Sequence, residues 1–204
     1  MKTIVRNDIA MKIKQITDVI ERFAPLALQE SYDNAGLVVG RPDSEVSRAL
    51  LAVDVTEAVL DEAEREGCGL VITHHPIVFH PLKRFNSADC VQRCVERAIR
   101  SGIALYACHT NLDSTPHGMS WRLASLVGVG ELRVLEPSPS GVPDAGFGVV
   151  GELCEAMPAE AFLRRVMERT GARVVRHSAL GDRPVRRGAV CTGAGASLIG
   201  AARC

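Results

Sequence analysis

The sequence lacks the features that mark membrane, secreted and nucleic-acid-binding proteins. No apolar run approaches the roughly 18 residues that a membrane span needs. The N-terminus has no signal-peptide pattern, and the seven cysteines show no Cys-x-x-Cys spacing, so we expect a reduced, cytoplasmic protein without a membrane partner. The 24 basic and 24 acidic residues balance, which argues against nucleic acid as a partner.

The balanced total hides an uneven distribution of charge. Residues 161–204 carry only two acidic residues against nine arginines, which are Arg164, Arg165, Arg169, Arg173, Arg176, Arg183, Arg186, Arg187 and Arg203. Such a cluster steers a phosphorylated substrate in some proteins. The alternative is a solvated face that pairs with the acidic remainder or with another subunit.

Hydrophobic periodicity predicts alternating helices and strands in the first half of the chain. Three helices are expected over residues 12–23, from an N-cap at Thr56 to Gly67, and from an N-cap at Ser87 to Gly102. Three nearly continuous apolar runs, residues 49–53, 69–73 and 103–108, read as buried strands. Strands joined by single helices predict an α/β fold with a mainly parallel sheet flanked by helices.

The second half has a less regular pattern and is expected to form a second α/β lobe. Strands are predicted over residues 146–154, 173–177 and 188–192, and helices over residues 118–127, 158–170 and 194–203. We expect a first lobe over residues 11–130 and a second lobe, incomplete at its C-terminus, over residues 131–204. Because Met11 could itself start the chain, residues 1–10 are expected to be an unstructured N-terminal extension.

Groups that bind metals follow the ends of three neighbouring predicted strands. These are Asp54, the pair His74 and His75, and His109 with Asp113. The carboxyl ends of parallel strands meet at one edge of a sheet, where ligands bind. Imidazole and carboxylate are ligands for zinc, iron, manganese or nickel, so the pattern predicts a metal site. The alternative for a histidine pair is hydrogen bonding and packing at a strand end.

Five other features are weaker candidates for function. His80 and Lys83 lie on the loop after the histidine pair, where they could touch a substrate or belong to a mobile surface loop. His117 is expected in a turn and His177 on the surface. The segment 193–197 (Gly-Ala-Gly-Ala-Ser) could cradle an anion, but it lacks the lysine of a P-loop, which favours helix–strand packing.

Three motifs together resemble signatures of the Nif-three-like family, whose members are also known as type-two GTP cyclohydrolase I. They are Asp-Asn-Ala-Gly-Leu at 33–37, Ile-Thr-His-His-Pro-Ile at 72–77 and His-Thr-Asn-Leu-Asp at 109–113. The segment Cys-Thr-Gly-Ala-Gly at 191–195 resembles a further family motif, so the likeness covers roughly residues 11–204.

The resemblance implies two interlocked α/β lobes around a dinuclear site for two divalent metal ions, and assembly into a homohexameric ring. His74 and His75 would each ligate a different metal, and Asp113 would join one of them. The family completes this site with a Gly-His-x-x-x-Glu segment near the C-terminus, and this sequence ends before such a segment. We therefore expect either a truncated chain or a chain that lacks half of the metal site, and weakened metal binding in both cases.

The activity implied by the resemblance is hydrolytic opening of the purine imidazole ring of GTP, which gives formate and dihydroneopterin triphosphate. His109 is the residue that we expect to move the proton in this reaction. The alternative is a non-catalytic metal-binding or regulatory adaptor protein, with this chain inactive.

Overall fold

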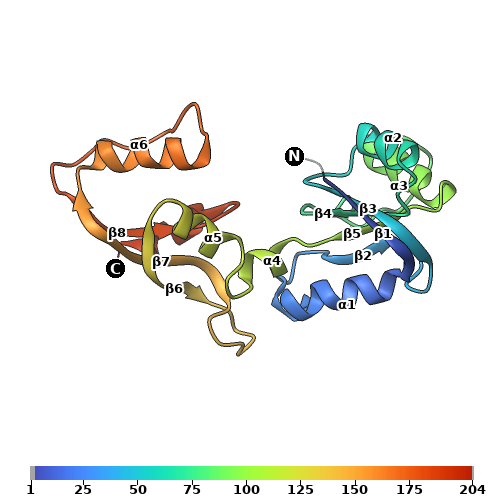
Figure 1. Ribbon diagram of the computed structural model, residues 1–204, viewed down its shortest axis with the longest axis horizontal. Helices are drawn as coiled ribbons and strands as arrows, with labels where there is room; N and C mark the ends of the chain where they lie inside the picture. Colours follow the sequence, from blue (N-terminus) through green and yellow to red (C-terminus); the bar gives the residue numbers. More distant parts are fainter. Residues whose placement is uncertain (1–2, 204) are drawn as a thin grey trace. The chain divides into compact units, whose positions relative to one another are not determined.

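The computed structural model describes residues 3–203 and divides the chain into two units, one up to Leu112 and the other from Asp113 (Figure 1). The sequence predicted a boundary after residue 130. The boundary lies earlier because the helix at residues 119–126 packs against the second sheet.

The first unit contains a mixed sheet of five strands. They are β1 (Thr3–Lys12), β2 (Gly36–Val39), β3 (Glu45–Ala52), β4 (Leu70–Thr73) and β5 (Ala104–Ala107), and their order in the sheet is β1-β3-β4-β5-β2. Only the three central strands run parallel, and both edge strands pair antiparallel. The sequence predicted a mainly parallel sheet, whereas parallel pairing is confined to β3, β4 and β5.

Helices cover both faces of this sheet, as the sequence predicted. Helix α1 (Ile13–Phe23) lies on one face, and α2 (Glu57–Arg65) and α3 (Cys90–Arg100) lie together on the other (Figure 1). A short 3₁₀ turn, η1 (Leu26–Leu28), follows α1. The faces bury separate apolar clusters, with Leu50, Leu60 and Val71 on the α2/α3 side.

Capping explains where two of these helices begin. The Thr56 side chain accepts a hydrogen bond from the backbone N–H of Val59, which confirms the predicted N-cap of α2. The predicted N-cap of α3 at Ser87 is wrong. Asp89 caps this helix by accepting from the backbone N–H of Gln92, and Ser87 lies before it with a positive φ of 57°.

The N-terminal segment is not an unstructured extension over the residues that the structure describes. Strand β1 pairs antiparallel with β3, from Thr3 opposite Leu51 to Lys12 opposite Glu45, with a register shift between Arg6 and Met11. This pairing gives hydrogen-bond partners to the backbone N–H and C=O groups along the edge of β3. The need to satisfy these groups is a reason for the N-terminal segment to fold onto the sheet.

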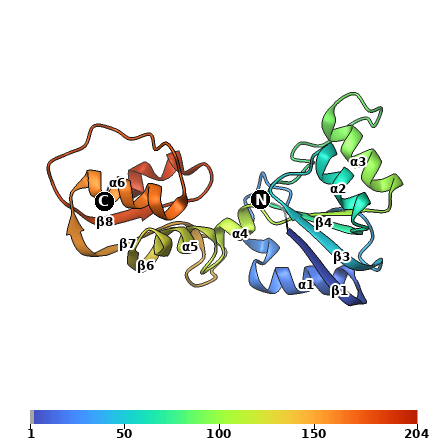
Figure 2. The same ribbon diagram turned by 45° about the horizontal axis from the view of Figure 1, so that its top comes forward.

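The second unit contains an antiparallel sheet of three strands, in the order β6-β7-β8. The strands are β6 (Val129–Pro137), β7 (Gly146–Met157) and β8 (Val185–Val190), and the helices are α5 (Met119–Leu126), α6 (Ala159–Thr170) and α7 (Ile199–Ala202), with a 3₁₀ turn η2 (Gly195–Leu198). Helix α6 follows directly on β7 (Figure 2). Its Phe162 and Val166 pack against the same apolar cluster as Ala124 of α5 and Val149 of β7.

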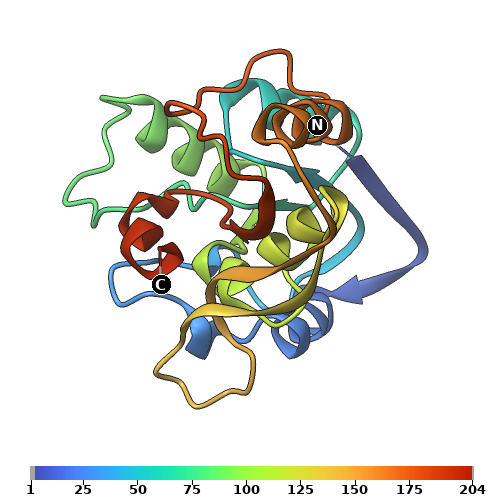
Figure 3. The same cartoon turned by 90° about the vertical axis from the view of Figure 1, so that its left-hand side faces the viewer.

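Two predictions for this unit need correction. Residues 173–177 form no strand but belong to a long irregular segment between α6 and β8 (Figure 3), in which Val174 is 79% exposed. These residues offer no apolar face to bury, which removes the usual reason for an amphipathic strand to join a sheet. The predicted helix at 194–203 is instead split into the 3₁₀ turn η2 and the short helix α7.

The helix α4 (Thr110–Ser114) crosses the boundary between the two units. Within residues 3–203, none of the helices has the length and apolar character needed to cross a membrane.

Candidate metal centre

The ends of the three parallel strands bring the predicted histidines to one edge of the first sheet. Thr73 at the end of β4 lies between Ala52 of β3 and Ala107 of β5 in the ladder. The carbonyl oxygen of Val53, just beyond β3, accepts hydrogen bonds from the backbone N–H groups of His74 and His75. The chain therefore turns immediately after β4, and both histidines are placed at this edge.

Three imidazoles converge there. One ring nitrogen from each of His74, His75 and His109 lies within 4.8 Å of those of the other two. The ring centroids are 4.9 Å apart for His74 and His75, and those of His109 lie 5.2 and 5.6 Å from them. This histidine cluster (His74, His75 and His109) could hold a metal ion, and three imidazoles form a known zinc ligand set that leaves one coordination position open.

Each ring of the histidine cluster is oriented by a hydrogen bond at Nδ1. His74 Nδ1 lies 2.9 Å from the carbonyl oxygen of Cys108, and His75 Nδ1 lies 2.7 Å from Asp54 Oδ1. His109 Nδ1 lies 2.8 Å from Asp33 Oδ1. A partner at one ring nitrogen is typical of metal-binding histidines, because it fixes the ring and leaves the other nitrogen for the ion.

The carboxylates that orient His75 and His109 differ in their surroundings. The Asp54 side chain is 58% exposed, whereas that of Asp33 is fully covered. Burial acts to raise the pKa of Asp33, but hydrogen bonds from Thr110, His109 and the backbone N–H of Asn34 outweigh it and hold the pKa below its ordinary value. Asp33 is therefore an ionised group inside the protein at neutral pH.

Asp113, the fourth predicted site residue, belongs to the second unit. Its side chain is buried, and its Oδ1 accepts a hydrogen bond of 3.1 Å from the Thr192 hydroxyl. Thr192 comes directly before Gly193, so the contact links Asp113 to the Cys-Thr-Gly-Ala-Gly motif. Metal binding by Asp113 stays a prediction, as does a second metal ion.

The weaker candidates divide between surface and turn positions. His80 and Lys83 are exposed on the loop after the histidine pair, and the His80 ring lies against Phe79 with centroids 5.1 Å apart. His117 lies in a turn with a φ of 60°, as predicted. His177 is exposed, as expected, and its Nδ1 bonds only locally, to the carbonyl oxygen of Ser178.

The glycine-rich segment after β8 leads into η2, a 3₁₀ turn of four residues. Gly195 approaches Cys191 so closely that an added Cβ would lie 2.9 Å from its Cβ, which fits the predicted role in close packing. Two of the arginines that precede this segment form ion pairs within the second unit, Arg164 with Glu160 and Arg187 with Glu152. Pairing within the unit fits the expectation of a solvated face for these two.

Aromatic side chains adjoin the histidine cluster on one side. The Phe79 ring lies edge-on to His109 with centroids 6.1 Å apart, and Tyr32 lies 6.3 Å from Phe79. Phe79 is 39% exposed and Tyr32 is 62% exposed, so both present ring surface to the solvent beside the cluster. Aromatic faces of this kind bind planar rings by stacking.

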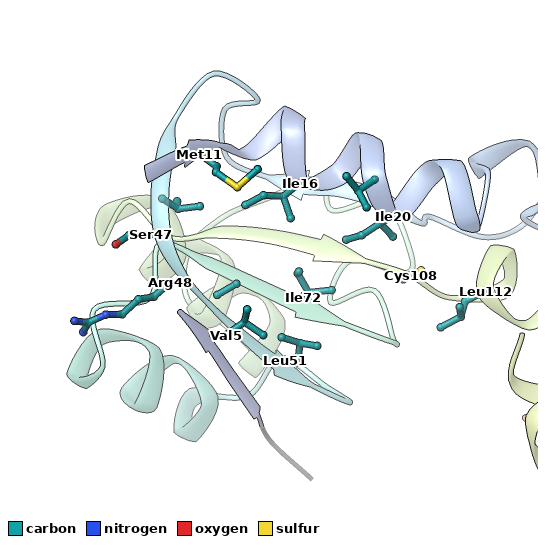
Figure 4. Close-up of a pocket in the computed structure, with 13 residues that line it drawn as sticks. Val5, Met11, Ile16, Ile20, Ser47, Arg48, Leu51, Ile72, Cys108 and Leu112 are labelled. Atoms are coloured by element: carbon teal, nitrogen blue, oxygen red, sulfur yellow. The ribbon is translucent and has the colours of Figure 1, made fainter. Parts of the chain in front are cut away.

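An apolar pocket of about 540 Å³ lies between α1 and the sheet of the same unit (Figure 4). Its lining includes Val5, Ile16, Leu51 and Ile72 but no histidine, aspartate or glutamate. The pocket therefore offers neither imidazole nor carboxylate for a metal, and the histidine cluster is the better candidate for chemistry.

Sequence reasoning missed the role of Asp33. The residue stands 76 positions before His109, and no spacing rule connects the two. The available signal was its place at the head of the Asp-Asn-Ala-Gly-Leu motif, to which no role was assigned. Asp54 was found because it directly follows a strand.

Comparison with known proteins identifies the chain's relatives. The family model Duf34/NIF3 (NGG1p interacting factor 3) matches residues 11–204. The chain is 32% identical over 194 residues to the GTP cyclohydrolase 1 type 2 homolog of Clostridium acetobutylicum, covering 95% of this chain and 72% of that protein. It is 30% identical to NIF3-like protein 1 of Drosophila melanogaster, covering 92% of this chain and 65% of that protein.

Solved structures show the same fold. Reduced HcgD from Methanocaldococcus jannaschii matches with a TM-score of 0.78 and 30% identity, covering 96% of this chain and 75% of that one. A Staphylococcus aureus hypothetical protein matches with a TM-score of 0.81 and 25% identity, covering 92% and 73%. The mixed α/β architecture is therefore shared with proteins whose structures are known.

Proposed function

Because the chain belongs to the Duf34/NIF3 family, we propose that it is a metal-dependent hydrolase that acts on GTP. The reaction opens the imidazole ring of the purine and yields formate and dihydroneopterin triphosphate. The names of several bacterial relatives, GTP cyclohydrolase 1 type 2 homolog, support the substrate. The observation that carries the proposal is the convergence of three imidazoles within 4.8 Å at the strand ends.

The donor set suits a divalent transition metal. His74 and His75 are the proposed ligands, because a partner at Nδ1 orients each ring. Asp113 is the proposed carboxylate ligand, and we propose two ions, as the family resemblance implies. Zinc, iron, manganese and nickel all accept this donor set. When bound, such ions supply Lewis-acid chemistry and make water a better nucleophile at neutral pH.

The chain's own residues perform the remaining steps. His109 moves the proton, since its ring adjoins both other histidines and is only 18% exposed. The exposed faces of Phe79 and Tyr32 suit the planar purine, and Lys83 on the same loop supplies a positive charge for phosphate. General acid–base catalysis by a positioned imidazole contributes roughly 10²–10⁴-fold to a rate.

The proposal is tested on the full chain loaded separately with each of the four metals. We expect metal by elemental analysis, and formate with a pteridine chromophore after incubation with GTP. Loss of a group that only orients a ligand costs roughly 10–100-fold in metal affinity. His75→Ala removes a proposed ligand itself, so it should weaken metal binding by more than this and abolish formate release. The matched control His177→Ala, at an exposed histidine of the other unit, should retain both.

The outcomes separate the two functions that the sequence left open. Metal binding that is lost in His75→Ala, without formate from any loaded form, would favour a metal-binding or regulatory adaptor protein. Unchanged metal content in His75→Ala would show that the histidine cluster is not the metal site.

We also propose that the protein self-associates into a homohexameric ring, as the family resemblance implies. Exposed apolar side chains at the pocket beside α1, among them Val5, Val19 and Leu51, support an association surface in the first unit. Light scattering gives the mass of the assembly. A mass of one chain at micromolar concentration would exclude the ring.

A further inference from the structure

The carboxylate of Asp33 is saturated with hydrogen-bond donors. Its side chain has no exposed surface. Oδ1 accepts from the backbone N–H of Asn34 at 2.7 Å and lies 2.8 Å from His109 Nδ1. Oδ2 accepts from the backbone N–H of Thr110 at 3.0 Å and from the Thr110 hydroxyl. Three donors and one imidazole nitrogen, from two stretches of chain far apart in the sequence, thus meet at one buried group.

These contacts determine where the proton on His109 must lie. The backbone N–H groups of Asn34 and Thr110 can only donate, so both oxygens of Asp33 are acceptors. An ionised carboxylate has no hydrogen to offer to His109, which means that Nδ1 carries the hydrogen. A neutral imidazole has a single N–H, so its Nε2 is left with a free lone pair.

Nδ1 of each of the other two rings bonds to a group of a different kind. His74 donates from Nδ1 to the Cys108 carbonyl oxygen, an acceptor supplied by the backbone. His75 pairs with Asp54, which is 58% exposed and whose place water can take. Asp33 thus differs from these two Nδ1 partners, because it is a fully covered charged side chain.

We propose that Asp33 is a positioning residue that fixes His109 in the tautomer with its Nε2 lone pair available at the histidine cluster. The neighbouring Asn34 supports the same arrangement, because its side-chain amide donates a hydrogen bond of 2.7 Å to the carbonyl oxygen of Val78 on the loop after His75. The Asp-Asn pair of the 33–37 motif thus ties both histidine-bearing segments together. The proposal rests on the proposed function in one respect only, namely that the reaction uses the Nε2 lone pair of His109.

The test reads the tautomer directly from the ¹⁵N chemical shifts of the histidine rings in the metal-free full chain, at a pH where the imidazoles are neutral. Loss of cross-peaks in His109→Gln assigns the ring. We expect wild-type His109 to be protonated at Nδ1. In Asp33→Ala the buried acceptor is gone, and the Nδ1–H form should become a minority because a free imidazole prefers the proton on Nε2.

A control separates tautomer selection from a general structural role. Thr110→Val removes the hydroxyl contact to Asp33 Oδ2 and leaves the Oδ1 contact to His109 in place. This variant should lose stability and keep His109 protonated at Nδ1. Protonation of wild-type His109 at Nε2 would overturn the proposal even if Asp33→Ala does not fold, and so would an unchanged tautomer in a folded Asp33→Ala protein.

The activity measurement is kept separate from this result. If the metal-loaded wild type releases formate, Asp33→Ala should lower kcat by roughly 10²–10⁴-fold with a smaller effect on KM, as expected when a histidine loses its orienting carboxylate. If the wild type releases no formate, the proposed function fails while the tautomer measurement still decides the role of Asp33.

Discussion

Replacing Asn111 with alanine should destabilise the first unit strongly, because this buried amide joins the end of α1 to the backbone of His109. Asn111 is fully buried. Its Nδ2 donates to the carbonyl oxygen of Ala24 at 2.8 Å, and its Oδ1 accepts from the backbone N–H of His109 at 2.9 Å. The alanine variant leaves both partners without this side chain.

The expected magnitude follows from these two contacts. Leaving a buried polar group unsatisfied costs about 1–3 kcal/mol, and Ala24 is completely buried, so the two losses together should cost about 2–6 kcal/mol. With an m value of about 2 kcal/mol/M in urea, this corresponds to a lower unfolding midpoint by about 1–3 M.

The assay is urea unfolding of the full chain followed by circular dichroism. Fluorescence of Trp121, the single tryptophan, reports on the second unit in the same samples. The matched control is Asn86→Ala, at an exposed asparagine of the first unit, which should change stability by less than about 0.5 kcal/mol. A midpoint for Asn111→Ala that equals that of Asn86→Ala would refute the reasoning.

Three further changes test the packing and the ionisation of the first unit. Gly40→Ala should lower the free energy of unfolding by about 1–3 kcal/mol, because φ is +115° and an added Cβ would lie 2.6 Å from the Cβ of Ala104. Thermal unfolding measures this loss, and an unchanged melting temperature would contradict the close approach. Arg97 holds the pKa of Glu64 down to about 2, so the stability that this pair provides is present above about pH 4.5 and is lost as the pH falls toward 2. Glu64→Gln should therefore be less stable than wild type at pH 7, with the difference closing in acid; a difference that grows in acid would show the opposite sign. Burial raises the pKa of the Cys94 thiol to about 12, so Cys94 should be alkylated more slowly at pH 8 than the exposed thiols. Mass spectrometry follows the modification of each cysteine, and equal rates would show that Cys94 is accessible.

The central strands and the candidate metal ligands could be predicted because their signals are local. The apolar runs that became β4 and β5 stand directly before His74 and His109, so strand pairing alone brings these rings together. Thr56 likewise sits where an N-cap belongs, and its side chain performs that role.

The features that sequence reasoning missed depend on contacts between distant residues. Strand β6 was overlooked because mixed polar and apolar residues give it a burial pattern without clear alternation, and it is held by its antiparallel pairing with β7. Strand β1 has exposed apolar residues such as Val5 and Ile9, and its partner β3 makes it a strand. The link from Asp33 to His109 spans 76 positions and leaves no periodic signal.

The groups that bond to Nδ1 of the three rings lie between residues 33 and 108. Asp33, Asp54 and the carbonyl of Cys108 belong to the same unit as the histidines that they orient. The Nδ1 anchoring of the three imidazoles is therefore internal to the first unit and is built without any residue of the second.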